Sequence, residues 1–208
     1  MPNASSVMRL SRYKNALMKL KALNFVRVFS DNLGDAAGVT ATQVRKDFSS
    51  FGITGNRRGG YKVEELMDQL NSILGKDKIH EVVVVGVGNI GRALLRYKGF
   101  ELSGLKLGAG FEIDSSKQGN LNGIEIYGLE KLHEYVAEHG VKFGIIAVPE
   151  FAAQQVFEVM TAAGIRGVLN FAPSRLKSTD DCVVRNIHLI SELESIIYFV
   201  TVNERTMV

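Results

Sequence analysis

The chain has 208 residues, of which 46% are hydrophobic and 23% charged, which suits one large globular domain or two small ones. No segment approaches the roughly 18 consecutive apolar residues that a membrane-spanning helix needs. The polar residues 1–6 are not followed by the apolar segment of a secretory signal. One cysteine, Cys182, excludes an internal disulfide and a cysteine-based metal cluster, so we expect a cytoplasmic location and no metal site.

The net charge of +3 is unevenly distributed along the chain. The first 62 residues hold eleven lysines and arginines but only three acids, a balance of +8, so the other 146 residues carry −5. Such an excess indicates a module that meets a polyanion, or a basic surface that is merely solvated. The charge balance by itself leaves both interpretations open.

Helical periodicity begins early in the chain. Leucines and Tyr13 recur at spacings of three and four over residues 8–23, which predicts an amphipathic helix. A short second helix is expected from Asp31 to Ala37, with Ser30 as its N-cap and Gly38 as its end. A further helix is expected from Val63 to Leu74, and its inward side chains would be Leu66, Leu70, Ile73 and Leu74.

Between these segments, Thr40 and Gln43 form a capping-box pair that begins a helix from Ala41 to Phe51. Two short helices joined by residues 38–40 are typical of a helix-turn-helix. The second would be the recognition helix, with Val44 and Phe48 facing the core. Its polar residues nearest a DNA major groove would be Thr42, Gln43, Arg45 and Lys46.

A glycine-flanked basic tip follows at residues 55–61 and is typical of a hairpin wing. Arg57 and Arg58 at this tip suit DNA phosphates or a minor groove. In isolation such a pair is more often a solvated turn. Directly after a recognition-helix pattern, DNA contact is the favoured interpretation.

The segment Val82 to Val85 leads straight into Gly86-Val87-Gly88-Asn89-Ile90-Gly91. A buried strand, a glycine turn and a helix N-terminus are what the pyrophosphate of a dinucleotide needs. Gly86 permits the tight turn, Gly88 allows the phosphates to approach the backbone, and Gly91 allows close packing of helix on strand. The free N–H groups at the helix start would face the anion.

Acidic residues follow the next expected strand, Lys106 to Phe111. Glu112 lies 21 residues after Gly91, close to the position of a ligand for the ribose 2′-hydroxyl, and favours NAD(H) over NADP(H). Asp114 is a second candidate, although a surface turn suits it better than Glu112. Lys117 lies close enough to complicate this charge argument.

Strands and helices continue to alternate after this point. We expect strands at 124–127, 143–148 and 167–170 and helices at 129–139 and 151–163. The fold class is therefore α/β: a winged helix-turn-helix followed by a doubly wound parallel sheet of the Rossmann type. Residues 171–173 lie at the carboxyl end of the last strand, the edge at which such sheets bind ligands.

The chain lacks a recognisable catalytic constellation. None of its four histidines stands with an acid in a proton-relay pattern, and no length remains for a substrate domain. We therefore predict no catalytic residues and a cofactor that is bound but not turned over. Two alternatives stay open: a small NAD-dependent oxidoreductase, and a CoA- or nucleotide-binding module with the same strand–glycine–helix start.

The last apolar stretch, Ile190 to Val202, is compatible with a helix. It follows the sheet without an evident core to fill, which suggests burial in a partner subunit, while a helix capping its own domain is an equal alternative. The expected parts are a DNA-binding domain at 1–77, a nucleotide domain at 78–189 and a dimerisation helix at 190–208.

The chain resembles the Rex family of redox-sensing transcriptional repressors over nearly its whole length. The segments that carry the resemblance are 38–40 with 43–47, 51–52, 60–61, 63–66, 86–94, 97–100, 145–149 and 167–173. The family is a homodimer of winged-helix and Rossmann domains with swapped C-terminal helices. The resemblance implies a repressor that binds palindromic operator DNA and releases it when NADH binds.

The resemblance also implies roles for individual residues. Arg45 and Lys46 would contact the major groove, Arg57 the minor groove, and Tyr61 is expected near the DNA. Tyr97 would lie beside the nicotinamide. The cofactor edge would be lined by Ala147, Val148, Pro149, Asn170, Phe171 and Ala172.

Coupling between the two domains would involve Arg12, Tyr97 and residue 188. The family often has an aspartate where this chain has His188, and a histidine cannot make the same charge pair with Arg12. The wing also departs from the family, since Arg58-Gly59 stands where glycine and valine are common. We therefore expect an altered NADH response and an added charge on the wing.

Overall fold

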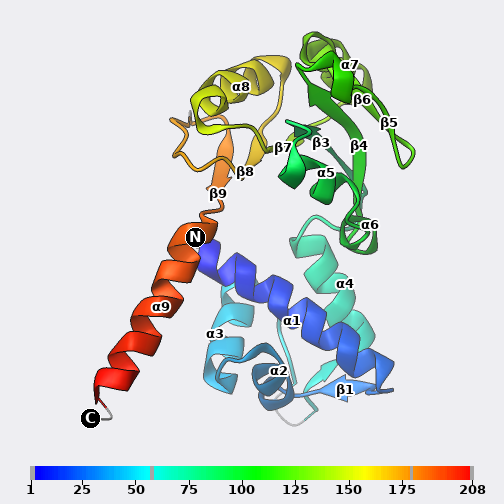
Figure 1. The fold of residues 1–208 in the computed structure, drawn as a ribbon. Helices are drawn as coiled ribbons and strands as arrows, with labels where there is room; N and C mark the ends of the chain where they lie inside the picture. The colour runs from blue at the N-terminus through cyan, green and yellow to red at the C-terminus, as the bar shows by residue number, and fades with distance from the viewer. Residues whose placement is uncertain (1–2, 57–58, 179, 207–208) are drawn as a thin grey trace. The chain divides into compact units, whose positions relative to one another are not determined.

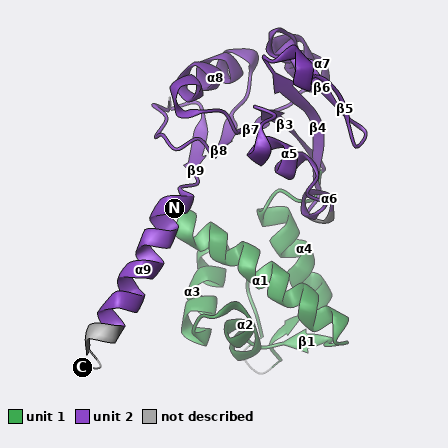
Figure 2. Ribbon diagram, in the orientation of Figure 1, with its two compact units in different colours: residues 1–78 green, residues 79–208 purple. Residues whose placement is uncertain are grey.

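The computed structural model describes residues 3–56, 59–178 and 180–206 (Figure 1). The chain divides into two compact units, residues 1–78 and residues 79–208 (Figure 2). Each unit has its own hydrophobic core, and each is described by itself below.

The described part of the first unit forms four helices and a small antiparallel sheet. In chain order these are α1 (Ala4–Ala22), β1 (Arg27–Val28), α2 (Ser30–Ala37), α3 (Ala41–Ser50), β2 (Tyr61–Lys62) and α4 (Val63–Ile73). β1 pairs with β2, and an isolated bridge joins Asn56 to Gly60 at the base of the wing. The predicted winged helix-turn-helix is therefore confirmed.

Local sequence explains the helix-turn-helix. The Thr40 side chain accepts a hydrogen bond from the Gln43 backbone at 3.2 Å and caps α3. Gly38 ends α2 with a φ of 69°, a left-handed conformation that favours glycine. The expectation that Ser30 caps α2 is wrong, because Phe29 occupies the cap position and the Asn32 side chain accepts from its backbone N–H at 2.9 Å.

The core of the first unit lies between the helices. Tyr13, Phe48 and Tyr61 meet edge to face, with ring centroids 5.5 and 5.1 Å apart. Val44 and Phe48 are buried as predicted, and so are Leu66 and Leu70. Ile73 was expected to face inward but is 38% exposed, because its side chain points away from the core that Leu70 enters and Leu74 contacts.

The second unit is a seven-stranded sheet with the order β5-β6-β4-β3-β7-β8-β9. The strands are β3 (His80–Val85), β4 (Leu105–Glu112), β5 (Gly119–Leu121), β6 (Ile124–Gly128), β7 (Phe143–Ile146), β8 (Gly167–Asn170) and β9 (Val183–Asn186). All neighbours pair in parallel except β5, which pairs antiparallel to β6. Without β5, this is the doubly wound Rossmann order, and the predicted fold class is confirmed.

Helices lie in the connections from β3 to β4, from β6 to β7 and from β7 to β8. They are α5 (Asn89–Leu95), α6 (Gly99–Leu102), α7 (Leu132–His139) and α8 (Glu150–Ala163), with single 3-10 turns η1 (Ser115–Lys117) and η2 (Leu129–Lys131). The helix expected over 129–139 thus begins with a 3-10 turn. The strand order reverses between β3 and β7, because β4 lies on one side of β3 and β7 on the other. This switch point is where open α/β sheets bind ligands.

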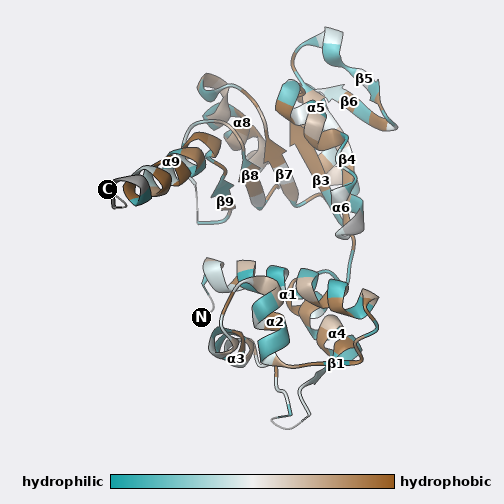
Figure 3. Ribbon diagram, turned by 60° about the horizontal axis from the view of Figure 1, so that its bottom comes forward, coloured by the Kyte–Doolittle hydropathy of each residue, from teal (hydrophilic) through white to brown (hydrophobic). Residues whose placement is uncertain are grey.

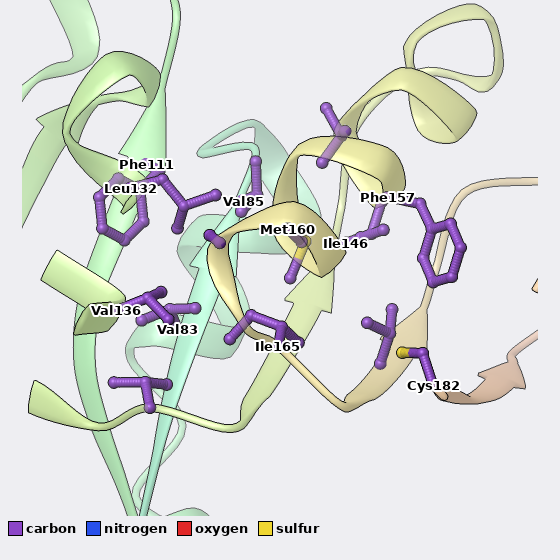
Figure 4. Packing of buried hydrophobic residues seen from close by; sticks show 14 of the residues in the cluster. Val83, Val85, Phe111, Leu132, Val136, Ile146, Phe157, Met160, Ile165 and Cys182 are labelled. Atoms are coloured by element: carbon purple, nitrogen blue, oxygen red, sulfur yellow. The ribbon is translucent and has the colours of Figure 1, made fainter. Parts of the chain in front are cut away.

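The core of the second unit packs α7 and α8 against the sheet. Val83, Phe111, Ile146, Phe157 and Met160 lie in it with at most 1% of their surface exposed (Figure 4). Cys182 belongs to the same cluster, and burial raises the pKa of its thiol. This environment fits a structural side chain and not a reactive one.

The chain ends in α9 (Leu189–Thr206), which begins one residue earlier than predicted. Its apolar side chains are exposed, with 59% of Leu193, 63% of Ile197 and 62% of Phe199 accessible, and apolar residues recur along the helix (Figure 3). The alternative in which this helix caps its own domain is therefore wrong. Among the described helices, none is long and apolar enough to cross a membrane.

Candidate functional site

The glycine loop connects β3 to α5 at the switch point of the sheet. Gly86 has a φ of 94°, and a Cβ there would come within 2.6 Å of the Ala147 carbonyl oxygen. A Cβ on Gly91 would strike the carbonyl oxygen of Gly86, so α5 packs directly on the turn. A Cβ on Gly88 would meet nothing within 4 Å and would project into open space. Each glycine thus has the geometry that its predicted role requires.

Glu112 ends β4 beside this loop and is 9% exposed. Its Oε2 accepts a hydrogen bond from the Val87 backbone at 2.8 Å, and its Oε1 accepts from Ile113 and Asp114 at 2.9 and 3.2 Å. The carboxylate therefore fixes the glycine loop to the next strand. Oε2 retains a lone pair that can accept from a ligand hydroxyl, whereas both lone pairs of Oε1 are used.

Asp114 lies at the start of η1 and pairs with Lys117 at 3.0 Å. Hydrogen bonds from Ser116 and Lys117 lower the pKa of Asp114 to about 2. The carboxylate is therefore charged, and it offsets the Lys117 charge that complicated the choice between NAD(H) and NADP(H). Asp114 thus lies in a surface turn and also lines the cleft described next.

An apolar cleft of about 530 Å³ lies at the carboxyl edge of the sheet. It is lined on one side by the glycine loop and the acids, and on the other by residues after β7 and on α8. The lining residues are Val85, Gly86, Gly88, Phe111, Glu112, Ile113, Asp114, Lys117, Leu129, Ala147, Val148, Pro149, Phe151, Ala152, Gln155, Val156 and Val159. Val87, in contrast, is buried in the core below the loop, while Asn89 and Ile90 are exposed.

Asn170 is fully buried at the end of β8, unlike a residue that lines the cofactor edge. Its amide donates to the Ser174 carbonyl at 2.8 Å and to Asn186 Oδ1 at 2.9 Å, and its oxygen accepts from the Ala172 backbone at 3.0 Å. Its side chain therefore shapes the turn that carries Phe171, which is half-buried. Ala172 is buried as well.

The three coupling candidates lie in different units. Arg12 is exposed on α1 of the first unit, whereas Tyr97 and His188 belong to the second. Tyr97 follows α5, is 62% exposed and meets Phe100 edge to face. His188 is half-buried directly before α9. Their coupling stays a prediction.

The exposed face of α3 carries Thr42, Arg45 and Lys46. Arg45 donates to the Thr42 hydroxyl at 3.2 Å, and both side chains are exposed to solvent. Gln43 is half-buried beside this face, and its Nε2 donates to Asp47 Oδ1 at 2.8 Å. A helix that enters a major groove needs polar side chains at such positions near its N-terminus.

Asp47 joins α3 to α1 from beneath that face. Arg9 donates to both carboxylate oxygens, at 2.6 and 2.7 Å, and the Tyr13 hydroxyl donates at 2.7 Å. Burial alone would raise the pKa of Asp47, but hydrogen bonds from Arg9, Tyr13 and Gln43 outweigh it and hold the pKa below its usual range. Burial and the bond to Asp47 raise the pKa of Tyr13.

The wing is described only in part. Arg57 and Arg58 lie outside the described residues. Tyr61 is half-buried against Phe48, so part of its ring belongs to the core. Arg27 on β1 donates to the Gly59 carbonyl at 3.0 Å and adds an exposed cation beside the wing.

Comparison with known proteins matches both units to families. Residues 2–49 match a family described as a putative DNA-binding protein N-terminus, and residues 77–174 match a family described as a CoA binding domain. A redox-sensing transcriptional repressor Rex from Carboxydothermus hydrogenoformans is 41% identical, over 91% of this chain and 92% of the relative. A second, from Syntrophomonas wolfei, is 37% identical over 97% and 96% of the two chains. The chain belongs to the Rex family.

Solved structures of a Rex-family repressor called RSP agree with this assignment. Its complex with NAD⁺ and operator DNA is 33% identical to this Rex chain, with a TM-score of 0.92 over 100% of this chain and 96% of RSP. Its complex with NADH gives a TM-score of 0.87 over 100% and 98% of the two chains. Rex relatives are named as transcriptional repressors, so the alternative of a small oxidoreductase is not supported.

Sequence reasoning missed several residues of this Rex chain. Ile113 and Phe151 line the cleft while 79% and 88% exposed, and only their apolar character next to a predicted strand end could have indicated them. Arg9 and Asp47 lie 38 positions apart, and no local pattern links them. Within residues 3–56, 59–178 and 180–206, no cluster of three or more potential metal ligands occurs.

Proposed function

We propose that this chain is a DNA-binding repressor that senses the ratio of NADH to NAD⁺. The observation that carries the proposal is the apolar cleft beside Gly86, Gly88 and Glu112 in a chain whose other unit is a winged helix. The functional parts are a DNA-binding domain at 1–77, an NAD(H)-binding domain at 78–189 and a dimerisation helix at 190–208.

The loop would hold the pyrophosphate of the nucleotide, and the acids would hold the neighbouring ribose. Gly86 to Gly91 would receive the pyrophosphate, because the open space beside Gly88 and the start of α5 allow an anion to approach backbone N–H groups. Glu112 or Asp114 would accept from the ribose hydroxyls. A 2′-phosphate at this position would face two carboxylates, so NAD(H) is favoured over NADP(H).

The nicotinamide would lie beyond the β7 end of the cleft. Ala147, Val148 and Pro149 would line this region, with Tyr97 and Phe171 nearby. The reduced nicotinamide ring is neutral and the oxidised ring is a cation, so apolar surroundings would favour NADH. A tenfold preference shifts a conformational equilibrium by about 1.4 kcal/mol per site.

We propose that the protein works as a homodimer that binds palindromic operator DNA. Exposed apolar side chains along α9 support a helix that is buried against the partner subunit. In the DNA-bound dimer, the two α3 helices would occupy major grooves about 34–36 Å apart. Closure of the NADH-bound dimer would change the distance between the two α3 helices, so that they no longer fit successive major grooves and the operator is released.

The remaining assignments follow from this role. Thr42, Gln43, Arg45, Lys46, Arg57, Arg58 and Tyr61 would contact or border the DNA, and Arg12, Tyr97 and His188 would couple the domains. A repressor needs access to chromosomal DNA and to the NADH pool, which places it in the cytoplasm. No catalytic residue or metal is part of this proposal.

Calorimetric titration of the full chain with NADH, NAD⁺, NADPH and CoA tests the nucleotide assignment. We expect NADH to bind tightest and CoA to bind weakly or not at all. Tighter binding of CoA would instead support the second alternative, a CoA-binding module, for which the family description of residues 77–174 is the supporting observation.

A further inference from the structure

Asp47 is a buried carboxylate on the helix proposed to read DNA. It is 3% exposed and accepts four hydrogen bonds, two from Arg9, one from Tyr13 and one from Gln43. Two of these donors belong to α1 and one to α3 itself. All four distances lie between 2.6 and 2.8 Å, as expected of hydrogen bonds to an ionised carboxylate.

This arrangement fixes the rotation of α3 about its own axis. Residues 44, 47 and 48 face inward, and residues 42, 45, 46 and 49 are exposed. Apolar contacts at Val44 and Phe48 tolerate small rotations, because they have no preferred direction. The paired bonds from Arg9 are directional, since a guanidinium fork matches a carboxylate in one plane. Asp47 therefore determines where Arg45 and Lys46 point.

The same carboxylate fixes the amide of Gln43. Because an ionised carboxylate can only accept hydrogen bonds, the Gln43 nitrogen must face Asp47. The Gln43 oxygen is then turned away from Asp47, and one N–H of the amide is left over. Gln43 is the third residue of α3 and is half-buried at the margin of the exposed face. Residues at the start of a recognition helix are those that reach base edges.

We propose that Asp47 is a positioning residue for base recognition, which holds α3 on α1 and presents the free edge of the Gln43 amide to one operator base pair. The inference rests on the proposed DNA binding. A free amide oxygen and N–H form the donor–acceptor pair that adenine matches in the major groove. Asp47 itself need not touch DNA.

Stability alone does not require such a residue. Replacing a buried ion pair by well-packed apolar side chains is often neutral or stabilising. Position 47 adjoins Tyr13 and follows the core residue Val44, so an apolar side chain at this position would extend the core. What an apolar side chain could not do is orient Arg9, Tyr13 and Gln43 together.

The test begins with the full-length wild type and a randomised duplex DNA library, from which a consensus is selected. Four variants are then compared on that consensus, on its single base-pair substitutions and on a scrambled duplex. They are Asp47→Asn, Tyr13→Phe, Gln43→Leu and Asp35→Asn. The last removes the same charge from an exposed position of α2 and serves as the control.

We expect Asp47→Asn to lower the ratio of consensus to scrambled affinity about tenfold, the scale of one lost base contact. Gln43→Leu should abolish discrimination at one base pair, and Asp47→Asn should abolish it at that same base pair. Asp35→Asn should keep the wild-type ratio. Tyr13→Phe keeps the ion pair and should lower the ratio about threefold, the scale of one hydrogen bond.

If Asp47→Asn does not fold, as judged by circular dichroism, Tyr13→Phe and Gln43→Leu still decide the outcome. The proposal is overturned if Gln43→Leu keeps the wild-type base preferences, or if a folded Asp47→Asn protein loses affinity equally for consensus and scrambled DNA. Failure of the wild type to select any consensus would overturn the proposed DNA binding and this inference with it. If the wild type selects a consensus but the variants keep its base preferences, only this inference is overturned and the proposed DNA binding stands.

Discussion

The Oε2 atom of Glu112 lies 2.8 Å from the backbone nitrogen of Val87, so the end of β4 is hydrogen bonded to the glycine loop after β3. This bond lies beside the switch point of the sheet, where the proposed nucleotide would lie. Glu112 thus orders the loop as well as being a candidate ligand for the ribose. The loop is held in place by the protein itself, and pre-organised sites spend less binding free energy on ordering.

The glycine loop allows stability and nucleotide binding to be separated. Gly88 has a φ of −75°, and a Cβ on it would meet nothing within 4 Å, so Gly88→Ala should fold normally. The added methyl group would occupy the proposed phosphate position and weaken NADH binding at least about tenfold. Gly91→Ala should instead destabilise the second unit by about 1–3 kcal/mol, because its Cβ would strike the Gly86 carbonyl oxygen. Thermal unfolding and NADH calorimetry check both; unchanged affinity in Gly88→Ala would contradict the pyrophosphate placement.

Asp114 should contribute to the choice between NADH and NADPH. Asp114→Asn removes a carboxylate from the cleft and leaves Lys117 without its ion pair, so a 2′-phosphate should be better tolerated. We expect the ratio of NADPH to NADH affinity to rise about tenfold, a change of 1.4 kcal/mol. Asp181→Asn, an exposed acid before β9, is the control. Equal ratios in both variants would place the ribose away from Asp114.

Asp47 should make stability depend on pH. Its pKa in the folded chain is below the unfolded value of about 3.9, so in acid the unfolded chain binds more protons. The stabilisation by Asp47 is therefore fully present above that value and is lost as pH falls through the folded pKa. Asp47→Asn should cost about 3 kcal/mol or more near pH 7, since it breaks a buried pair.

Urea unfolding of wild type and Asp47→Asn at pH 7, 5, 4 and 3 measures this difference. The gap between the two proteins should narrow below about pH 4, where Asp47 becomes protonated in the unfolded state. Asp35→Asn, which alters an exposed acid, should track the wild type throughout. A constant gap across the series would show that Asp47 is not held in its ionised form.

The C-terminal helix should determine the oligomeric state. Leu193 and Ile197 lie four positions apart on α9 and are 59% and 63% exposed, so an aspartate at either would be buried without a partner in the proposed dimer. Ile197→Asp should weaken self-association by more than about tenfold in sedimentation velocity experiments. Ser195→Asp adds the same charge to the same helix without removing an apolar side chain, and it should weaken self-association less. A dimer that survives Ile197→Asp unchanged would argue against association through α9.

The sequence predicts the elements whose signals are local. Thr40 and Gln43 mark the start of α3 by themselves, and four consecutive valines before Gly86 mark β3 and its turn. Ser30 was misassigned because α2 begins without a capping side chain at its N-cap, Phe29, and Asn32 within the helix accepts from the Phe29 backbone instead. Ile73 kept the helical spacing, but the core meets this turn through Leu70 and Leu74, and only the tertiary structure decides which of these side chains is covered.

Contacts between distant residues could not be predicted in this way. The Lys46-Asp47 pair looks like a solvated charge pair in sequence, yet Asp47 is buried because Arg9, 38 positions away, supplies its counter-charge. Asn170 follows a strand at the ligand edge, as a binding residue would, but its amide is consumed by hydrogen bonds within the β8–β9 connection. Whether such a polar side chain stabilises the fold or faces a ligand depends on its burial and its hydrogen-bond partners, which residue type and position in the chain do not reveal.

Fluorescence anisotropy of a labelled palindromic operator, titrated separately with NADH and NAD⁺, tests the central claim most directly. The account predicts that NADH releases the DNA at concentrations where NAD⁺ leaves the complex intact. Arg45→Ala should fail to bind the operator while keeping its NADH affinity, because Arg45 is exposed on α3 in the other unit. Operator binding that ignores both nucleotides, or that responds equally to the two, would contradict the account.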